Sequence, residues 1–408
     1  MKFIARQPIL DRERELFAYE LLFRSGIENS CDIENLDHAS ASMFDTSLLI
    51  GLPALTGGHR AFINCSKDFL VQGYISLFPR DLVVVELLET IQPDEDVIEV
   101  CRELKQQGYL LALDDFVDTP DWAPLVRIAD VIKVDFRLTS RAEQRALVAR
   151  YAGCGIRMLA EKVETHEEFA EAMKMGYSLF QGYFFCHPEI LSRRAIPSSK
   201  LAYIQLLKET AAHEFDMKAI ASKIKREPSL TFKLFRYLNS AAFGFRMEIH
   251  SVNQALSLLG EQEIRKWVAV VAMSVMADGK PGELMTVPLV RGRFCELLAP
   301  LAGMADQASD LFLLGLLSVV DAILDQPLDL ILEELPVRTD IKEALLQQEV
   351  SYRDVLDIAT ALERADWDKV TALTTKLRMK ESDISALYAS ALDWAASLRK
   401  TVNLAPVG

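Results

Sequence analysis

The stretch LLALDDF, residues 110–116, decides the fold of the first half of the chain. Its apolar residues are followed at once by Asp114 and Asp115, and a carboxylate beside a buried strand is costly unless it is paired or bound to metal. The neighbouring runs LVVVEL (82–87) and VIKVDF (131–136) have the same form, a short apolar segment carrying a charged side chain near its end. Short runs of this kind predict strands buried on both faces, as in parallel sheets.

Amphipathic segments separate these apolar runs. One covers residues 95–108 and ends at Gly108, and another covers 165–176, with Thr165 as a helix start and Gly176 as a stop. Repeated strand–helix units predict an α/β fold, either a (β/α)8-like barrel or a doubly wound sheet. The barrel is favoured because polar side chains end nearly every run, whereas a doubly wound sheet gathers its site at one switch point.

The polar side chains at the ends of the runs predict a metal site. Each of them alone is more simply explained as a solvated strand end or a surface salt bridge, so the prediction rests on their joint pattern. Carboxylate and amide oxygens suit Mg²⁺ or Mn²⁺ rather than zinc, and a carboxylate that bridges two cations is the basis of two-metal phosphoester hydrolysis. A lysine among them could neutralise charge or position a water. The residues are Glu20, Asn64, Glu86, Asp114, Asp115, Lys133, Glu161 and Gln181.

Composition limits the possible partners and the compartment. The 408 residues suffice for two or three domains, and the net charge of -14 argues against binding to a nucleic acid polymer or an anionic membrane. The six cysteines form no CxxC pair and no zinc spacing, which indicates reduced thiols. The most apolar window, residues 267–277, is shorter than the ~20 residues that span a bilayer. We therefore expect a cytoplasmic protein.

Eight motifs in the first half resemble those of EAL-domain cyclic-di-GMP phosphodiesterases. ELLFR resembles the E-A-L-x-R signature of that family, and QPI upstream fits its opening strand. The resemblance implies a (β/α)8-like barrel over residues 1–190 that hydrolyses cyclic di-GMP to the linear dinucleotide pGpG and controls motility and biofilm formation. The motifs are QPI (7–9), ELLFR (20–24), FIN (62–64), ELLE (86–89), DDF (114–116), IKVD (132–135), EKVE (161–164) and QGYFF (181–185).

The resemblance also implies a role for each site residue. Lys133 would hold the nucleophilic water, Glu161 would assist as general base, and Asp115 would join them in catalysis. Arg24 would meet a phosphate, while Glu164 and Gln181 would complete the substrate pocket and Glu89 would brace the loop after Asp115. The cofactor would be Mg²⁺ or Mn²⁺, and the barrel could form a homodimer. The implied metal ligands are Glu20, Asn64, Glu86, Asp114, Asp115 and Glu161.

The chain departs from the family pattern in three places. Leu21 replaces the signature alanine, where we expect packing rather than metal contact, and Lys162 replaces a glycine. The family's DDFGTG loop reads DDFVDTP here, so both glycines are lost. Because glycine permits backbone conformations that other residues resist, we predict that glycines at Val117 and Thr119 raise activity or metal affinity. The alternatives to an active enzyme are a scaffold or cyclic di-GMP receptor without turnover, and a two-metal phosphodiesterase with another nucleotide substrate.

The second half has helical periodicity throughout. After a linker at 191–200, residues 201–402 predict an all-α domain, followed by a tail at 403–408. Pro228 fits a helix start, and the window 267–277 predicts a core helix. The segments PSLTFKLFRYLNSAAFG and IHSVNQALSLLG resemble the HDOD domain, including Asn239 and Ser240.

The HDOD resemblance argues against chemistry in the second half. Where HD hydrolases carry a metal-binding His-Asp pair, this chain has Ser318 and Val319, which cannot supply that site. His213 and His250 are more simply ordinary, partly buried histidines. The domain would regulate the barrel or recruit protein partners, an inference from family analogy alone.

Overall fold

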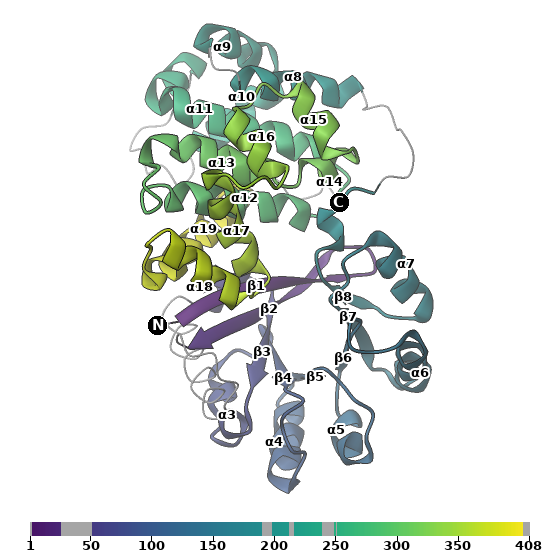
Figure 1. Ribbon diagram of the computed structural model, residues 1–408. Helices are drawn as coiled ribbons and strands as arrows, with labels where there is room; N and C mark the ends of the chain where they lie inside the picture. The colour runs from purple at the N-terminus through teal and green to yellow at the C-terminus, as the bar shows by residue number, and fades with distance from the viewer. Residues whose placement is uncertain are drawn as a thin grey trace. The chain divides into compact units, whose positions relative to one another are not determined.

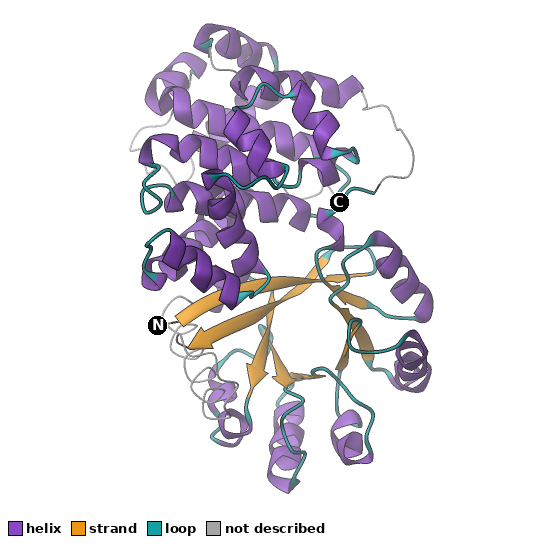
Figure 2. Ribbon diagram, in the orientation of Figure 1, coloured by secondary structure: helices purple, strands orange, loops and turns teal. Residues whose placement is uncertain are grey.

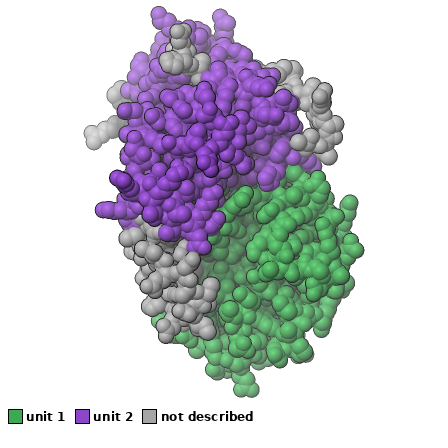
Figure 3. Space-filling view, in the orientation of Figure 1, with its two compact units in different colours: residues 1–185, 362–365 green, residues 186–361, 366–408 purple. Residues whose placement is uncertain are grey.

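The computed structural model describes residues 2–25, 51–189, 198–211, 216–238, 249 and 251–402. The chain divides into two compact units (Figure 3). Unit 1 contains residues 1–185 together with Leu362–Ala365, and unit 2 contains residues 186–361 and 366–408. Unit 1 combines strands with helices, whereas the described part of unit 2 is built of helices (Figure 2).

Eight strands of unit 1 close into a barrel in sequence order (Figure 1). The predicted barrel is therefore confirmed, and the doubly wound sheet is wrong. Neighbouring strands from β2 to β8 pair in parallel, but β1 is antiparallel to both β2 and β8. The strands are β1 (Lys2–Asp11), β2 (Leu16–Ser25), β3 (Arg60–Cys65), β4 (Val83–Leu87), β5 (Leu110–Leu113), β6 (Val131–Asp135), β7 (Arg157–Glu161) and β8 (Leu179–Gln181).

A short turn reverses the direction of β1. The Asp11 carboxylate accepts hydrogen bonds from the backbone amides of Glu13 and Glu15, and the Asp11 amide donates to the Glu15 carbonyl at 2.9 Å. Arg14 completes the turn with a left-handed φ of 63°. A parallel connection needs a crossover of about a dozen residues or more. The brevity of this turn therefore makes β1 and β2 an antiparallel hairpin.

Alternation along each strand builds the barrel core. Successive side chains on a strand point to opposite faces, so each strand sends every second residue inward. One inward residue from each strand joins a buried apolar cluster that fills the barrel. Its members are Ile9, Ala18, Phe62, Val84, Ala112, Val131, Leu159 and Leu179.

Helices around the barrel begin and end at capping residues. Thr165 and Glu168 form a capping box at the start of α7, and Gly176 ends that helix in a left-handed conformation, as predicted. Ser140 and Glu143 form a second capping box, on α6. The helices are α2 (Leu52–Thr56), α3 (Lys67–Val71), α4 (Glu95–Gln106), α5 (Ala123–Val126), α6 (Arg141–Tyr151) and α7 (His166–Met175), with 3-10 turns at Tyr74–Leu77, Pro120–Trp122, Ala152–Cys154 and Phe184–Cys186.

Unit 2 contains the predicted helices. Pro228 begins α10, as expected, and Gly260, with φ 71° and ψ 173°, kinks α11. Trp267 and the apolar residues from Val268 to Met273 are buried, which confirms a core helix. None of the described helices is both long and apolar enough to span a membrane. The helices are α8 (Ser198–Ala211), α9 (Met217–Arg226), α10 (Pro228–Leu238), α11 (Val252–Met276), α12 (Glu283–Leu298), α13 (Ala308–Leu317), α14 (Val320–Leu324), α15 (Leu328–Glu334), α16 (Thr339–Leu345), α17 (Ser351–Glu363), α18 (Trp367–Lys376) and α19 (Glu381–Val402), with a 3-10 turn at Ala305–Gln307.

Candidate metal centre and active site

The polar site forms a layer directly above the apolar core of the barrel. Two residues beyond a core residue, a strand again points inward. Glu20 thus follows Ala18 on β2, and Lys133 follows Val131 on β6. The same step of two residues places the other members, with the first aspartate directly after the end of β5. These members are Asn64 on β3, Glu86 on β4, Asp114 after β5, Glu161 on β7 and Gln181 on β8.

Lys133 lies among the carboxylates of this layer. Its side chain is 1% exposed, and its Nζ forms a short ion pair with Glu86 Oε1. The same nitrogen lies 2.7 Å from an Asp114 oxygen, 2.9 Å from Glu161 Oε1 and 3.5 Å from Glu20 Oε2. One ammonium group therefore contacts four carboxylates, and the site retains an excess of formal negative charge.

Several buried oxygens of the site have no hydrogen-bond partner among the described residues. Nearly all buried polar groups in proteins are paired, so such atoms indicate a missing ligand or water. Carboxylate and amide oxygens are the ligands that hard divalent cations prefer. The residues present therefore fit a divalent cation. The unpaired atoms are Asn64 Oδ1, Glu86 Oε2, Glu161 Oε2 and Gln181 Oε1.

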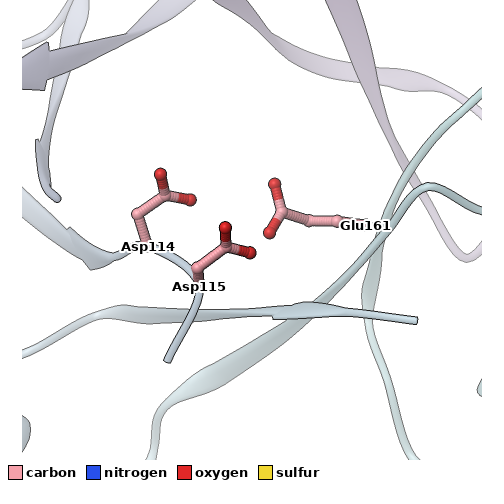
Figure 4. Close-up of side chains that lie close together, drawn as sticks. All are labelled: Asp114, Asp115 and Glu161. Atoms are coloured by element: carbon pink, nitrogen blue, oxygen red, sulfur yellow. The ribbon is translucent and has the colours of Figure 1, made fainter. Parts of the chain in front are cut away.

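Asp114, Asp115 and Glu161 form the tightest acidic cluster of the site. One oxygen from each lies within 4.8 Å of the others, a spacing that could hold a metal ion. Figure 4 shows the three carboxylates close together, two from adjacent positions after β5 and one from β7. Asp115 reaches the cluster through a left-handed backbone, with φ of 40°. Adjacent residues on a strand point to opposite faces, so this unusual conformation lets both aspartates face one site.

Burial changes the proton affinity of these acids. Desolvation raises the pKa of Glu161 to about 8, although the nearby Lys133 opposes the shift. Desolvation also raises the pKa of Glu86 well above its usual value, again against the effect of Lys133. For Asp115, burial and the neighbouring Asp114 both raise the pKa. The four surrounding acids hold the pKa of Lys133 well above its usual value despite its burial, so it stays charged.

Gln181 connects the metal site to β1. Its Nε2 donates to Glu20 Oε2 at 2.6 Å and to Gln7 Oε1 at 2.8 Å. Gln7 is a neighbour of the site that the sequence pattern alone does not indicate, although the QPI motif contains it. The following Gly182 is required by a close approach, because a Cβ there would lie 2.0 Å from the Val163 carbonyl oxygen.

Two residues expected at the site, Glu164 and Glu89, are exposed. Glu164 pairs with Arg137. Glu89 lies near enough to Asp115 for its charge to contribute to the raised pKa of that residue, but among the described residues no hydrogen bond or ion pair joins Glu89 to the loop after Asp115. Its bracing role, like the substrate contact of Glu164, therefore stays a prediction. The side chain of Arg24 lies outside the described residues.

Two of the three departures from the EAL pattern, Leu21 and Lys162, lie in positions that the structure explains. Leu21 is fully buried, in agreement with a packing role. Lys162 has a left-handed φ of 55°, a conformation that glycine adopts without strain. Its ammonium group forms a short ion pair with the buried Asp135. This pair places a second positive charge near Asp115, where it opposes the rise in that residue's pKa.

The structure removes the reason for expecting a gain from glycines in the DDFVDTP loop. Neither Val117 nor Thr119 has a positive φ; within the loop, that conformation belongs to Asp115. Glycine at both positions would mainly increase the freedom of the unfolded chain, at about 0.5–1 kcal/mol each. We now expect the double glycine variant to melt at a lower temperature and to bind Mn²⁺ no more tightly than the wild type. A higher Mn²⁺ affinity of the double variant in calorimetry would contradict this expectation.

In unit 2, the position of the HD metal pair is occupied by other contacts. Ser318 accepts a hydrogen bond from Arg291 Nη1 at 3.0 Å and donates to the Gly315 carbonyl at 2.7 Å, and Val319 is buried. Gly315 lies on α13, and a Cβ on it would lie 2.5 Å from the backbone of Arg291 on α12, so these two helices are in close contact there. Asn239, Ser240, His213 and His250 lie outside the described residues.

Comparisons with known proteins place this arrangement in a family. The EAL domain model matches residues 60–188, and the HDOD domain model matches residues 196–325. The uncharacterized protein YuxH of Bacillus subtilis is 34% identical over 97% of this chain and 98% of its own length. The cyclic di-GMP phosphodiesterase CdgJ of Vibrio cholerae is 34% identical over 98% of this chain and 94% of its own length. The chain belongs to the family of proteins that join an EAL domain to an HDOD domain.

Solved structures of EAL proteins are also similar to part of this chain. A standalone EAL protein from Vibrio cholerae O395, in its c-di-GMP-bound form, is 24% identical and covers 45% of this chain and 91% of its own chain, with a TM-score of 0.36.

Proposed function

We propose that the barrel of this chain is a cyclic-di-GMP phosphodiesterase that produces linear pGpG. The observation that carries the proposal is the polar layer above the barrel core, with its buried, unpaired oxygens. The family membership supports it, because the relative CdgJ is named for this activity. A divalent metal would be held by Glu20, Asn64, Glu86, Asp114, Asp115 and Glu161. When bound, divalent cations polarise phosphoryl oxygens and ease deprotonation of water, and two of them can clamp the reacting phosphate.

The chain's own groups supply the proton transfer and the charge. A water oxygen forms a bond to phosphorus as the bond to the leaving 3′ oxygen breaks. Glu161 accepts the proton of that water, and the 3′ oxygen takes up a proton from a solvent water as it leaves. Lys133 holds three carboxylates within 3 Å in one geometry and orients the water. Gln181 fixes Glu20 through its hydrogen bond. Arg24, on the same strand as Glu20, is assigned to a substrate phosphate.

Removal of Glu20 tests this assignment. The purified full chain should convert cyclic di-GMP to pGpG in the presence of Mn²⁺ or Mg²⁺, as followed by chromatography. Glu20→Ala should lower turnover more than about 100-fold, since loss of partners outside the direct ligand shell already costs 10–100-fold. Glu103→Ala is the matched control, because it removes an exposed glutamate from α4 in the same barrel and should leave turnover unchanged.

The outcomes separate the enzyme from its alternatives. Binding of cyclic di-GMP without product at any Mn²⁺ or Mg²⁺ concentration would replace the enzyme with a receptor. Equal product from the wild type and Glu20→Ala would show that the chemistry lies elsewhere. Product from another cyclic nucleotide alone would move the proposal to a different substrate.

The remaining assignments concern the whole chain. We propose an EAL domain over 1–190, a linker at 191–200, an HDOD domain over 201–402 and a tail at 403–408. The HDOD domain would regulate the barrel or recruit protein partners, and the barrel could pair with a second copy. By lowering cyclic di-GMP in the cytoplasm, the protein would favour motility over biofilm formation.

A further inference from the structure

Asp115 needs external support to stay in its observed conformation. A left-handed backbone costs a residue other than glycine about 1–2 kcal/mol, and such strain persists only where the surroundings enforce it. The loop that follows has no glycine. Val117 is 67% exposed, so its side chain adds little packing. A cavity of about 470 Å³ also lies between this loop and α6. The loop is therefore held at a few points rather than along its length.

The first point of attachment is Phe116. Its backbone amide donates to the carbonyl of Lys133 at 3.1 Å, which ties the loop to β6. Its ring is buried and meets the edge of the Tyr151 ring, with 5.7 Å between centroids. Trp122 packs edge-on against the same phenylalanine at 6.4 Å. Phe116 thus fixes the residue directly after Asp115.

The second point of attachment is Asp118. Its Oδ1 accepts a hydrogen bond from the Tyr151 hydroxyl at 2.6 Å. Its Oδ2 pairs with Arg150, but that arginine is 65% exposed, and exposed ion pairs contribute little. Burial and the bond to Asp118 raise the pKa of Tyr151 to about 12, so the hydroxyl remains a donor at neutral pH. Tyr151 therefore contacts both anchors, one with its ring and the other with its hydroxyl.

Tyr151 is well placed to hold the loop because it belongs to a rigid element. It is the last residue of α6, is 7% exposed, and follows a helix whose first turn is closed by a capping box. We propose that Tyr151 and Asp118 are positioning residues that hold Asp115 in place for metal binding. This inference rests on the proposed metal site. It identifies Tyr151 and Asp118 as residues that set the affinity of the site for a metal ion.

Mn²⁺ binding to the metal-free full-length chain tests this inference. Tyr151→Phe keeps the ring and removes only the hydroxyl. We expect it to weaken Mn²⁺ binding about tenfold in calorimetry, the lower end of the usual effect of residues that support metal ligands. Asp118→Ala should weaken it similarly. Asp118→Asn retains an acceptor for the hydroxyl and should keep most of the affinity.

Tyr109→Phe is the matched control. Tyr109 is also a buried tyrosine of the barrel, and its hydroxyl donates to the Phe78 carbonyl at 2.7 Å, away from the DDFVDTP loop. It should lower the melting temperature about as much as Tyr151→Phe but leave Mn²⁺ affinity unchanged. The inference is overturned if Tyr151→Phe binds Mn²⁺ like the wild type, or if Tyr109→Phe weakens binding equally. A wild type without measurable Mn²⁺ binding would overturn it too. Mn²⁺ binding without hydrolysis would instead defeat only the proposed enzyme, because the affinity comparison still stands.

Discussion

Lys133→Met should lower hydrolysis at least about 100-fold and destabilise the metal-free protein, and saturating Mn²⁺ should restore the stability but not the activity. The methionine fills similar volume but carries no charge. It would leave Glu20 and Asp114 without their cation, and removing one partner of a buried ion pair typically costs about 3–5 kcal/mol. Bound cations would neutralise the same acids and stabilise the folded state by mass action.

The activity would not return, because a cation among the acids does not replace the ammonium group that orients the water. We expect turnover to fall at least about 100-fold, the usual loss when one preorganised electrostatic contact is removed. Thermal melting with EDTA or Mn²⁺, alongside turnover, measures both effects. Lys105→Met is the control, since its pair with Asp130 is partly exposed and should be worth less than about 1 kcal/mol. A Lys133→Met chain that is stable in EDTA and active would contradict the central role of this lysine.

Mn²⁺ affinity should rise with pH up to about pH 8 and then level off. The raised pKa of Glu161, about 8, means that its carboxyl holds a proton at neutral pH in the absence of metal. A cation must displace that proton to bind. Release of one proton makes the affinity rise about tenfold per pH unit well below the pKa, so the affinities at pH 6 and pH 8 should differ by about 50-fold. A second proton from Glu86 would steepen the slope.

The stability of the metal-free chain should change in the opposite direction. A carboxyl whose pKa is raised in the folded state binds its proton more tightly there than in the unfolded chain. Its contribution to stability is therefore complete below the ordinary pKa of about 4.5 and is lost as the pH rises through about 8. Melting curves in EDTA should show this fall, and calorimetry in buffers of different ionisation enthalpy should count the released protons. A Mn²⁺ affinity that does not change with pH would contradict the assignment of Glu161 as the proton-releasing ligand. Glu103→Gln is the control and should bind Mn²⁺ with the same pH dependence as the wild type.

Much of the site could be predicted from the sequence because side chains two residues apart on a strand point to the same face. Once a run such as LLAL or LVVVE is taken as a strand, a polar residue at its end falls two positions beyond a core residue on the same face. Because the motifs resemble those of EAL domains, distant residues such as Glu20 and Glu161 could then be assigned to one site. The helix start at Pro228 was also predictable, because proline fixes its own φ and lacks a backbone N–H, which suits the first turn of a helix.

Other features depend on contacts between distant segments. Gln7 joins the site only because β1 runs antiparallel, and the turn between Asp11 and Glu15 lacks the Asn-Gly or Asp-Gly pair that signals a hairpin. From the sequence, the loss of both glycines from the loop after Asp115 predicts weaker activity or metal affinity. The support of this loop comes instead from Tyr151, 33 residues after Asp118, and no local pattern predicts that hydrogen bond.

The direction of β1 has a practical consequence for protein engineering. In a barrel whose strands are all parallel, the first strand starts at the end opposite the active site. Here Lys2 pairs with Ser25, past Glu20 toward the carboxyl end of β2, so the chain enters at the rim that carries the polar layer. Any affinity tag or sensor domain fused ahead of Lys2 would therefore begin at the rim of the barrel that carries the polar layer. There it could obstruct or regulate the access of the substrate to the site.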